Sequence, residues 1–244
     1  MNILCIGNSF SQNATRYLYD IARADGVSLN VANLYIGGCS LERHYRNMLS
    51  GERAYSLEYN GHKTGFHVSL KEALLNRCWD VITVQQASHF SFDFESYEPY
   101  LSEITEFVRK CAPKARIYVH QTWAYEEGSE RLAKVAGYER AEAMFEDIFC
   151  AYDLAAKKIS ADGIIPSGRL FKALLDEGAE GLYHDTFHAS RGLGRYALGL
   201  LWYSVLCGAD VLENTFCELD VPVTENELML VKKCVTAVGK INEK

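Results

Sequence analysis

The chain carries a serine where a strand is expected to turn into a helix. Ser9 lies in Gly7-Asn8-Ser9-Phe10-Ser11, directly after the apolar run 3–6. At such a turn a hydroxyl projects from the carboxyl edge of a sheet, beside the positive end of a helix dipole. A nucleophile or a phosphate can be held there. A serine at this position can also serve only as a helix cap, so the motif alone leaves both roles open.

A carboxylate and an imidazole occur together near the other end of the chain. Asp185 and His188 are three residues apart, in a loop before a helix expected at 192–207. The carboxylate can orient the imidazole, which can then take the proton of a serine hydroxyl. The pair could equally cap the following helix. His184 and His188 are four residues apart, but no third metal ligand is evident, so we expect no metal site.

Two further segments place hydrogen-bonding groups after strands. Gly37-Gly38 follows the second expected strand and allows exposed amide N–H groups of the kind an oxyanion needs, although a simple tight turn has the same sequence. Gln85, Gln86 and His89 follow the third expected strand. Polar side chains there cost free energy unless they are hydrogen-bonded, which favours a role in a site.

The elements that must position these residues alternate between short apolar runs and longer helical patterns. This alternation predicts an α/β fold with a parallel sheet and helices on both faces. Strands are expected at 2–7, 28–36, 80–84, 115–121 and 163–166, and helices at 12–25, 97–111, 131–159, 168–177, 192–207 and 224–239. Residues 54–68, around Asn60-Gly61, predict an inserted β-hairpin. We expect one domain over residues 1–244, with the strand-end loops converging at one sheet edge.

The combined pattern resembles the SGNH or GDSL hydrolase superfamily, from Gly7 to Tyr203. The family's first block holds the nucleophile, which corresponds to Ser9. Its last block is Asp-x-x-His, which corresponds to Asp185 and His188. The resemblance implies a serine esterase on a three-layer α/β/α sandwich with a flavodoxin-like five-stranded parallel sheet, and it requires no metal or organic cofactor.

The oxyanion hole implied by the resemblance is less complete in this sequence. Its backbone donors correspond to Ser9 and Gly38. The family's Gly-x-Asn block is absent, and Gln-Gln-x-Ser stands in its place. Gln86 is our preferred substitute for the missing asparagine, with Gln85 and His89 as alternatives.

The predicted edge loops are rich in aromatic and polar residues, which suits an ester of a carbohydrate or related polar alcohol. We expect a small, acetyl-type acyl group. Substrate contacts are expected from Gln85, His89, Gln121, Trp123 and Glu42, although the aromatic rings could instead be core packing.

Overall charge and the start of the chain bear on partners and location. The formal net charge is −7, without a run of basic residues, so we expect neither a nucleic-acid nor a membrane partner. The start lacks the pattern of a signal peptide, which predicts a cytoplasmic protein, or a secreted one if a leader was removed. The oligomeric state stays open.

Three other functions fit the same residues. Ser9, Ser11 and Thr15 loosely resemble the hydroxyl-rich phosphate loop of flavodoxins, which would make the chain an FMN-binding module. On the hydrolase fold itself, the protein could be an acyltransferase or a catalytically silent carbohydrate-binding protein.

Overall fold

The computed structural model describes residues 1–239, and the strands of this part form one mixed sheet. The strand order is β4-β3-β2-β1-β5-β6-β7. The strands are β1 (Asn2–Gly7), β2 (Asn30–Tyr35), β3 (Tyr55–Tyr59), β4 (His62–Val68), β5 (Val81–Val84), β6 (Arg116–His120) and β7 (Gly163–Ile165). The pairs β1–β2, β1–β5, β5–β6 and β6–β7 are parallel. The expected α/β fold and its five parallel strands are confirmed.

The hairpin at 54–68 extends this sheet. β3 pairs antiparallel with β2, and β4 pairs antiparallel with β3. The turn residues Asn60 and Gly61 both have positive φ, at 49° and 79°. This left-handed pair is the geometry that the Asn-Gly sequence favours in a two-residue hairpin. The predicted hairpin is therefore present, and it makes the sheet two strands wider than the parallel part.

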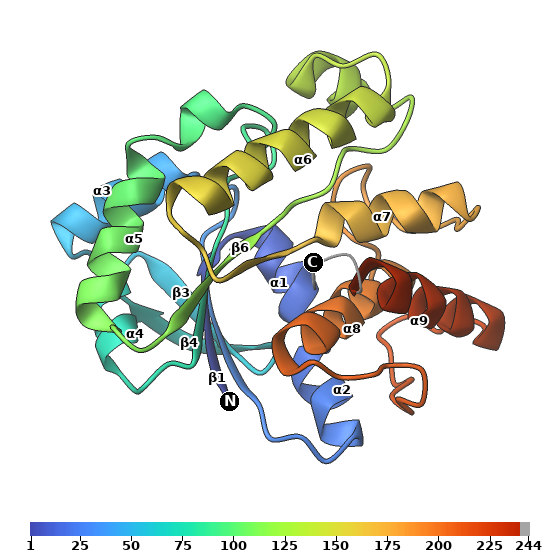
Figure 1. Ribbon diagram of the computed structural model, residues 1–244, viewed down its shortest axis with the longest axis horizontal. Coiled ribbons are helices and arrows are strands. Elements are labelled where there is room, and N and C mark those ends of the chain that lie inside the picture. Colours follow the sequence, from blue (N-terminus) through green and yellow to red (C-terminus); the bar gives the residue numbers. More distant parts are fainter. Residues whose placement is uncertain (240–244) are drawn as a thin grey trace.

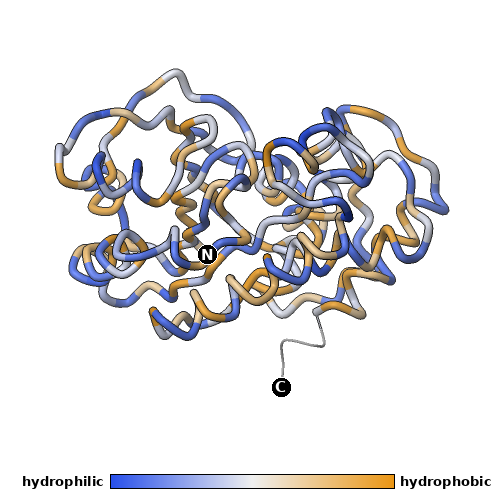
Figure 2. The backbone as a smooth tube through the Cα atoms, turned by 90° about the horizontal axis from the view of Figure 1, so that it is seen from above, coloured by the Kyte–Doolittle hydropathy of each residue, from blue (hydrophilic) through white to orange (hydrophobic). Residues whose placement is uncertain are grey.

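Helices cover both faces of the sheet (Figure 1). On one side lie α3 (Leu41–Ser50), α4 (Leu70–Leu75) and α5 (Tyr100–Cys111). On the other lie α1 (Ser9–Thr15), α2 (Leu18–Ala24), α8 (Leu193–Cys207) and α9 (Glu225–Gly239). The remaining helices are α6 (Ala141–Lys158), α7 (Ser167–Asp176), the 3₁₀ turn η1 (Phe94–Tyr97) and the π-helical turn η2 (Leu132–Ala136). Along the outer helices, hydrophilic and hydrophobic residues alternate every few positions, as amphipathic helices require (Figure 2).

Two expected helices are interrupted. The helix predicted at 12–25 begins earlier, at Ser9, and breaks into α1 and α2 at Arg16 and Tyr17. The Tyr17 hydroxyl donates to the carbonyl of Arg191 and accepts from the N–H of Asp220, so tertiary bonds hold this junction. The helix predicted at 131–159 is divided into η2 and α6 after Gly137, which has a φ of 78°. Glycine favours that left-handed conformation, and it ends the first turn.

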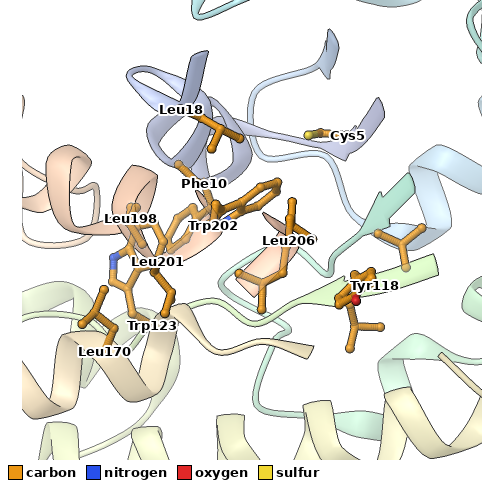
Figure 3. Packing of buried hydrophobic residues seen from close by; sticks show 14 of the residues in the cluster. Cys5, Phe10, Leu18, Tyr118, Trp123, Leu170, Leu198, Leu201, Trp202 and Leu206 are labelled. Carbon is orange, nitrogen blue, oxygen red and sulfur yellow. The ribbon is translucent and has the colours of Figure 1, made fainter. Parts of the chain in front are cut away.

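The core between α1, α7, α8 and the sheet is built around large aromatic rings. Trp123 and Trp202 are both fully buried. Trp123 packs on Phe10 of α1, with ring centroids 4.2 Å apart, and stacks on Phe171 of α7 at 4.6 Å. Figure 3 shows Trp123 among leucines of α8. This packing fixes α1, and with it Ser9 at the start of this helix, against the C-terminal third of the chain.

Candidate active site

Ser9 is the first residue of α1, and Asn8 caps this helix. The Asn8 side-chain oxygen accepts a hydrogen bond from the N–H of Phe10 at 3.0 Å. An asparagine cap directly after a strand starts the helix at once, which places Ser9 at the carboxyl edge of the sheet. The N–H of Ser9 has no partner within the helix because it belongs to the first turn.

Ser9, His188 and Asp185 form one chain of hydrogen bonds. Ser9 Oγ is 2.7 Å from His188 Nε2, and His188 Nδ1 is 2.8 Å from Asp185 Oδ2. The backbone N–H of His188 also donates to Asp185 Oδ1 at 2.9 Å. With Nδ1–H donating to the carboxylate, Nε2 is left to accept the serine proton. The structure thus brings together two segments that are 179 residues apart.

Asp185 is held in its charged form. Burial raises the pKa of Asp185, but hydrogen bonds from the side chain and backbone of His188 outweigh this, and the pKa lies below its usual value. A carboxylate that stays ionised can hold the imidazole tautomer and stabilise a positive charge on it.

Asn8 also ties the Ser9 turn to the glycine loop. Its Nδ2 donates to the carbonyl of Cys39 at 3.0 Å, and its Oδ1 accepts from Gln85 Nε2 at 2.8 Å. Gly38 lies in this loop at a φ of 60°. Within residues 1–239, its N–H has no hydrogen-bond acceptor. One buried asparagine therefore sets the position of Ser9 relative to an amide that is open to a ligand.

A cavity of about 270 Å³ lies over these groups. Residues 8–10, 37–38, 88–89 and 187–188 line it, together with Tyr35 and Arg131. The loops after β1, β2 and β5 therefore contribute to one concave site, together with Arg131 and the loop of Phe187 and His188. Such a cavity is small for a protein ligand site.

The two glutamines after β5 do not reach this cavity, which corrects the prediction for Gln86 and Gln85. Gln86 Nε2 donates to the carbonyl and hydroxyl oxygens of Ser96, and its Oε1 accepts from two backbone N–H groups. Gln85 bonds to Asn8 and to His120 Nδ1, the latter at 2.7 Å. Both glutamines are buried and connect loops. Of the three residues considered for the third oxyanion donor, His89 is the one that lines the cavity.

Three further predicted substrate contacts also lie elsewhere, and these predictions are corrected. Trp123 is buried, and its Nε1 donates to the carbonyl of Phe187. Gln121 is buried beneath α7, where its Oε1 accepts from the N–H of Arg169. Glu42 is on the outer side of α3 and pairs with Arg46 one turn later. Core packing and helix pairing account for these side chains.

Arg131 is a cavity residue that the sequence analysis did not single out. Its guanidinium carbon lies 3.7 Å from the centre of the Phe187 ring and 5.6 Å from that of Tyr125. Arg131 sits in a segment expected to be a regular helix. The signal that could have found it is Gly137, which ends the π-helical turn after Arg131 and separates this turn from α6.

The hydroxyls of the proposed flavin loop are engaged inside the protein. Ser11 Oγ bonds to the Asn33 side chain at 2.7 Å and to the carbonyl of Asn8 at 2.8 Å. Thr15 Oγ1 donates to the carbonyl of Ser11. Both residues are buried, and Ser9 faces His188. This arrangement leaves no row of exposed hydroxyls to bind a phosphate. It therefore argues against the hypothesis that the protein is an FMN-binding module.

Residues 1–239 contain no cluster of three or more His, Cys, Asp or Glu residues arranged to hold a metal ion. No helix in the described part of the chain has the length and hydrophobicity needed to cross a membrane.

The fold is that of the SGNH and GDSL hydrolases. A candidate SGNH hydrolase from Slackia heliotrinireducens superposes with a TM-score of 0.61 at 24% identity, over 84% of this chain and 98% of its own. A mutant of Axe2, an acetyl-xylooligosaccharide esterase from Geobacillus Stearmophilus, superposes with a TM-score of 0.54 at 12% identity, over 83% of this chain and 92% of its own.

The chain belongs to the DUF4886 family, a domain of unknown function, whose model matches residues 2–234. A DUF4886 family protein from Bacteroides uniformis is similar in structure, with a TM-score of 0.89 at 29% identity, over 98% of this chain and 94% of that one. No curated protein matches the sequence.

Proposed function

We propose that this protein is a serine-dependent carboxylic ester hydrolase that removes a small, acetyl-type acyl group from a carbohydrate or related polar alcohol. The observation that carries the proposal is the unbroken path from Ser9 Oγ through His188 to Asp185, with distances of 2.7 and 2.8 Å. This path opens into a cavity that also contains Gly38. A nucleophile, a base that bonds to it and a group that orients the base make up the machinery for acyl transfer.

In the first half of the reaction, His188 Nε2 takes the Ser9 proton while Oγ attacks the carbonyl carbon of the ester. The imidazolium is stabilised by Asp185, and it then donates the same proton to the oxygen of the departing alcohol. The carbon–oxygen bond of the ester breaks, and the acyl group stays on Ser9. Water enters, loses a proton to His188 and attacks the acyl carbon. The bond between the acyl carbon and Ser9 Oγ then breaks, and His188 returns the proton to Oγ, which releases the acid and restores Ser9.

The negative charge on the tetrahedral intermediate needs nearby donors. We assign this role to the N–H groups of Ser9 and Gly38, with His89 as the third donor. The pKa of His89 is lowered, first by burial and then by the positive charge of Arg131. A neutral imidazole keeps one N–H to donate at neutral pH. Each such donor contributes roughly 10²-fold to 10³-fold in kcat when it is well aimed.

A small acyl group and a polar alcohol suit the size and lining of the cavity. Its volume of about 270 Å³ leaves little room for a long acyl chain. Tyr35, Phe187 and His89 add flat ring faces beside the polar backbone of the glycine loop. Rings beside polar groups suit stacking on a sugar. The structural likeness to an acetyl-xylooligosaccharide esterase supports the same substrate class.

Labelling with a fluorophosphonate and hydrolysis of 4-nitrophenyl acetate test this function together. The wild-type protein should be labelled at Ser9 and should release nitrophenol, and Ser9→Ala should abolish both. Ser102→Ala is a matched control. Ser102 lies on α5, outside the cavity, and its hydroxyl donates to Glu98. The Ser102→Ala variant should therefore behave as the wild type.

Labelling at Ser9 without hydrolysis of any short-chain ester would point instead to an acyltransferase. Absence of both labelling and hydrolysis in folded wild-type protein would contradict the proposal and favour a catalytically silent binding protein.

A further inference from the structure

Arg131 places a positive charge in the wall of the cavity. Of the residues that line the cavity, it is the only one among the Asp, Glu, Lys and Arg types. The chain as a whole carries a formal net charge of −7. The Asp185 carboxylate, which pairs with His188, is not among the residues that line the cavity. The cavity wall itself therefore carries a positive charge, although the whole protein is negative. A local cation attracts anionic ligands even when the net charge is negative.

The charge of Arg131 is not neutralised by the protein. Among residues 1–239, no Asp or Glu oxygen lies within 4.0 Å of its guanidinium. Two nearby carboxylates of the same loop are bound to other cations: Glu130 pairs with Lys134, and Glu127 pairs with Arg140. The half-buried guanidinium instead rests on the rings of Phe187 and Tyr125. The guanidinium also hydrogen-bonds to the Tyr125 side chain. Because a guanidinium has five N–H donors, others remain to bind an oxyanion.

The position of Arg131 also indicates which part of a substrate it meets. The centroid of the Phe187 ring is 3.7 Å from the guanidinium carbon and 3.8 Å from the centroid of the His188 ring, so this ring contacts both groups. The guanidinium is therefore one aromatic ring away from the imidazole. Because His188 must protonate the departing alcohol, that alcohol lies over His188 and extends toward Phe187 and Arg131.

We propose that Arg131 selects esters whose alcohol part carries a carboxylate or a similar anion, such as an acidic sugar or a hydroxy acid. This inference rests on the proposed ester hydrolysis and narrows its substrate class. Binding of the anion to Arg131 draws the alcohol oxygen toward His188, so the interaction contributes to kcat/KM on the alcohol side of the ester.

The test compares 4-acetoxybenzoate with 4-acetoxybenzamide, which differ in charge and little in shape. For each enzyme, the charge preference is the ratio of the kcat/KM for the anionic ester to the kcat/KM for the neutral ester. The charge preference of a variant is then divided by that of the wild type. Differences in the chemical reactivity of the two esters cancel. Arg131→Met, which keeps an apolar chain against Phe187, should lower the charge preference about 10-fold to 100-fold, the range of a hydrogen bond to a charged group. Arg131→Lys should retain part of the preference for the anionic ester.

Lys134→Gln is the matched control. It removes the same charge from the same turn, but Lys134 is exposed and paired with Glu130. Its ratio should equal that of the wild type. Raising the salt concentration should lower the wild-type ratio and leave the Arg131→Met ratio nearly constant.

Three results would overturn the inference while leaving the proposed hydrolysis intact. In the first, Arg131→Met loses activity equally on both esters, which would mean that the guanidinium only holds Phe187 and His188 in place. In the second, Lys134→Gln changes the ratio as much as Arg131→Met. In the third, the charge preference appears for 4-nitrophenyl succinate, where the anion is on the acyl side, and not for 4-acetoxybenzoate. If Ser9 is not labelled by a fluorophosphonate and no ester is cleaved, the failure lies with the proposed function.

Discussion

Replacing Asn8 by alanine is expected to weaken both the fold and the site, because one buried side chain holds three segments together. Its carboxamide caps α1 at Phe10, donates to the carbonyl of Cys39 and accepts from Gln85. It is 1% exposed. Loss of the cap costs about 1 kcal/mol of folding free energy. The Gln85 amide and the Cys39 carbonyl are then left unpaired, at about 1–3 kcal/mol each.

These costs sum to about 3–7 kcal/mol. The free energy of unfolding should therefore fall by about 4 kcal/mol in Asn8→Ala, near the lower end of this range, because water can enter the vacated space and bond to the unpaired groups. Urea unfolding followed by tryptophan fluorescence measures this loss, since Trp123 and Trp202 are buried. Under conditions where the variant is folded, kcat on a short-chain ester should fall about 10²-fold, because Ser9 and the Gly38 amide are no longer fixed relative to each other.

Ser69→Ala is the matched control for Asn8→Ala. Ser69 caps α4 through a capping box with Glu72, without a link to the cavity. It should cost about 1 kcal/mol of folding free energy and leave turnover unchanged. If Asn8→Ala lost no more stability than Ser69→Ala, the account of Asn8 as a link between the two loops would be wrong.

Three other predictions follow from single groups. Asp185→Asn should remain folded and lower kcat about 10⁴-fold, measured by ester hydrolysis; an unchanged kcat would exclude Asp185 as the orienting group. Burial lowers the pKa of His44 and of His120 to about 3, so both stay neutral in the folded protein while the unfolded chain gains protons below pH 6.5. Stability should therefore fall as the pH is lowered, by about 2 kcal/mol per histidine between pH 7 and 5 in urea titrations, and a flat profile would contradict this. Gly61→Ala should destabilise the protein by at least about 1–3 kcal/mol in the same assay, because a methyl group would lie 2.2 Å from the carbonyl oxygen of Arg16 at a positive φ; wild-type stability would refute the strain argument.

The sequence predicts the parallel sheet and the loop convergence well, because these depend on local patterns. The run 3–6 is apolar throughout, as expected for a strand buried on both faces, and Asn60-Gly61 forms the expected hairpin turn. The convergence of the loops after β1, β2 and β5 follows from the rule that strand-end loops meet at one edge of a parallel sheet. The loop of Asp185 and His188 follows α7 instead of a strand, and its place beside Ser9 is implied by the family resemblance. Geometry of this kind is set by topology more than by any single side chain.

Side-chain direction is what the sequence does not determine. Gln86 and His89 follow the same strand, but only His89 lines the cavity, because Ser96 and two backbone amides take up the Gln86 carboxamide. Trp123 follows β6 at the same edge and points inward, where Phe171 provides a stacking partner. Arg131 was missed because the helical pattern continues through a π-helical turn that Gly137 ends. Each of these outcomes depends on contacts between segments distant in sequence.

The proposed mechanism requires that Ser9 carries the acyl group during turnover. Acid quenching of the enzyme during rapid turnover of 4-nitrophenyl acetate, followed by mass spectrometry of the intact protein and of its peptides, tests this claim directly. One acetyl group is expected, located on Ser9 of the wild-type protein and absent from the Ser9→Ala variant. An acetyl group on a different residue, or continuing turnover by Ser9→Ala, would contradict it.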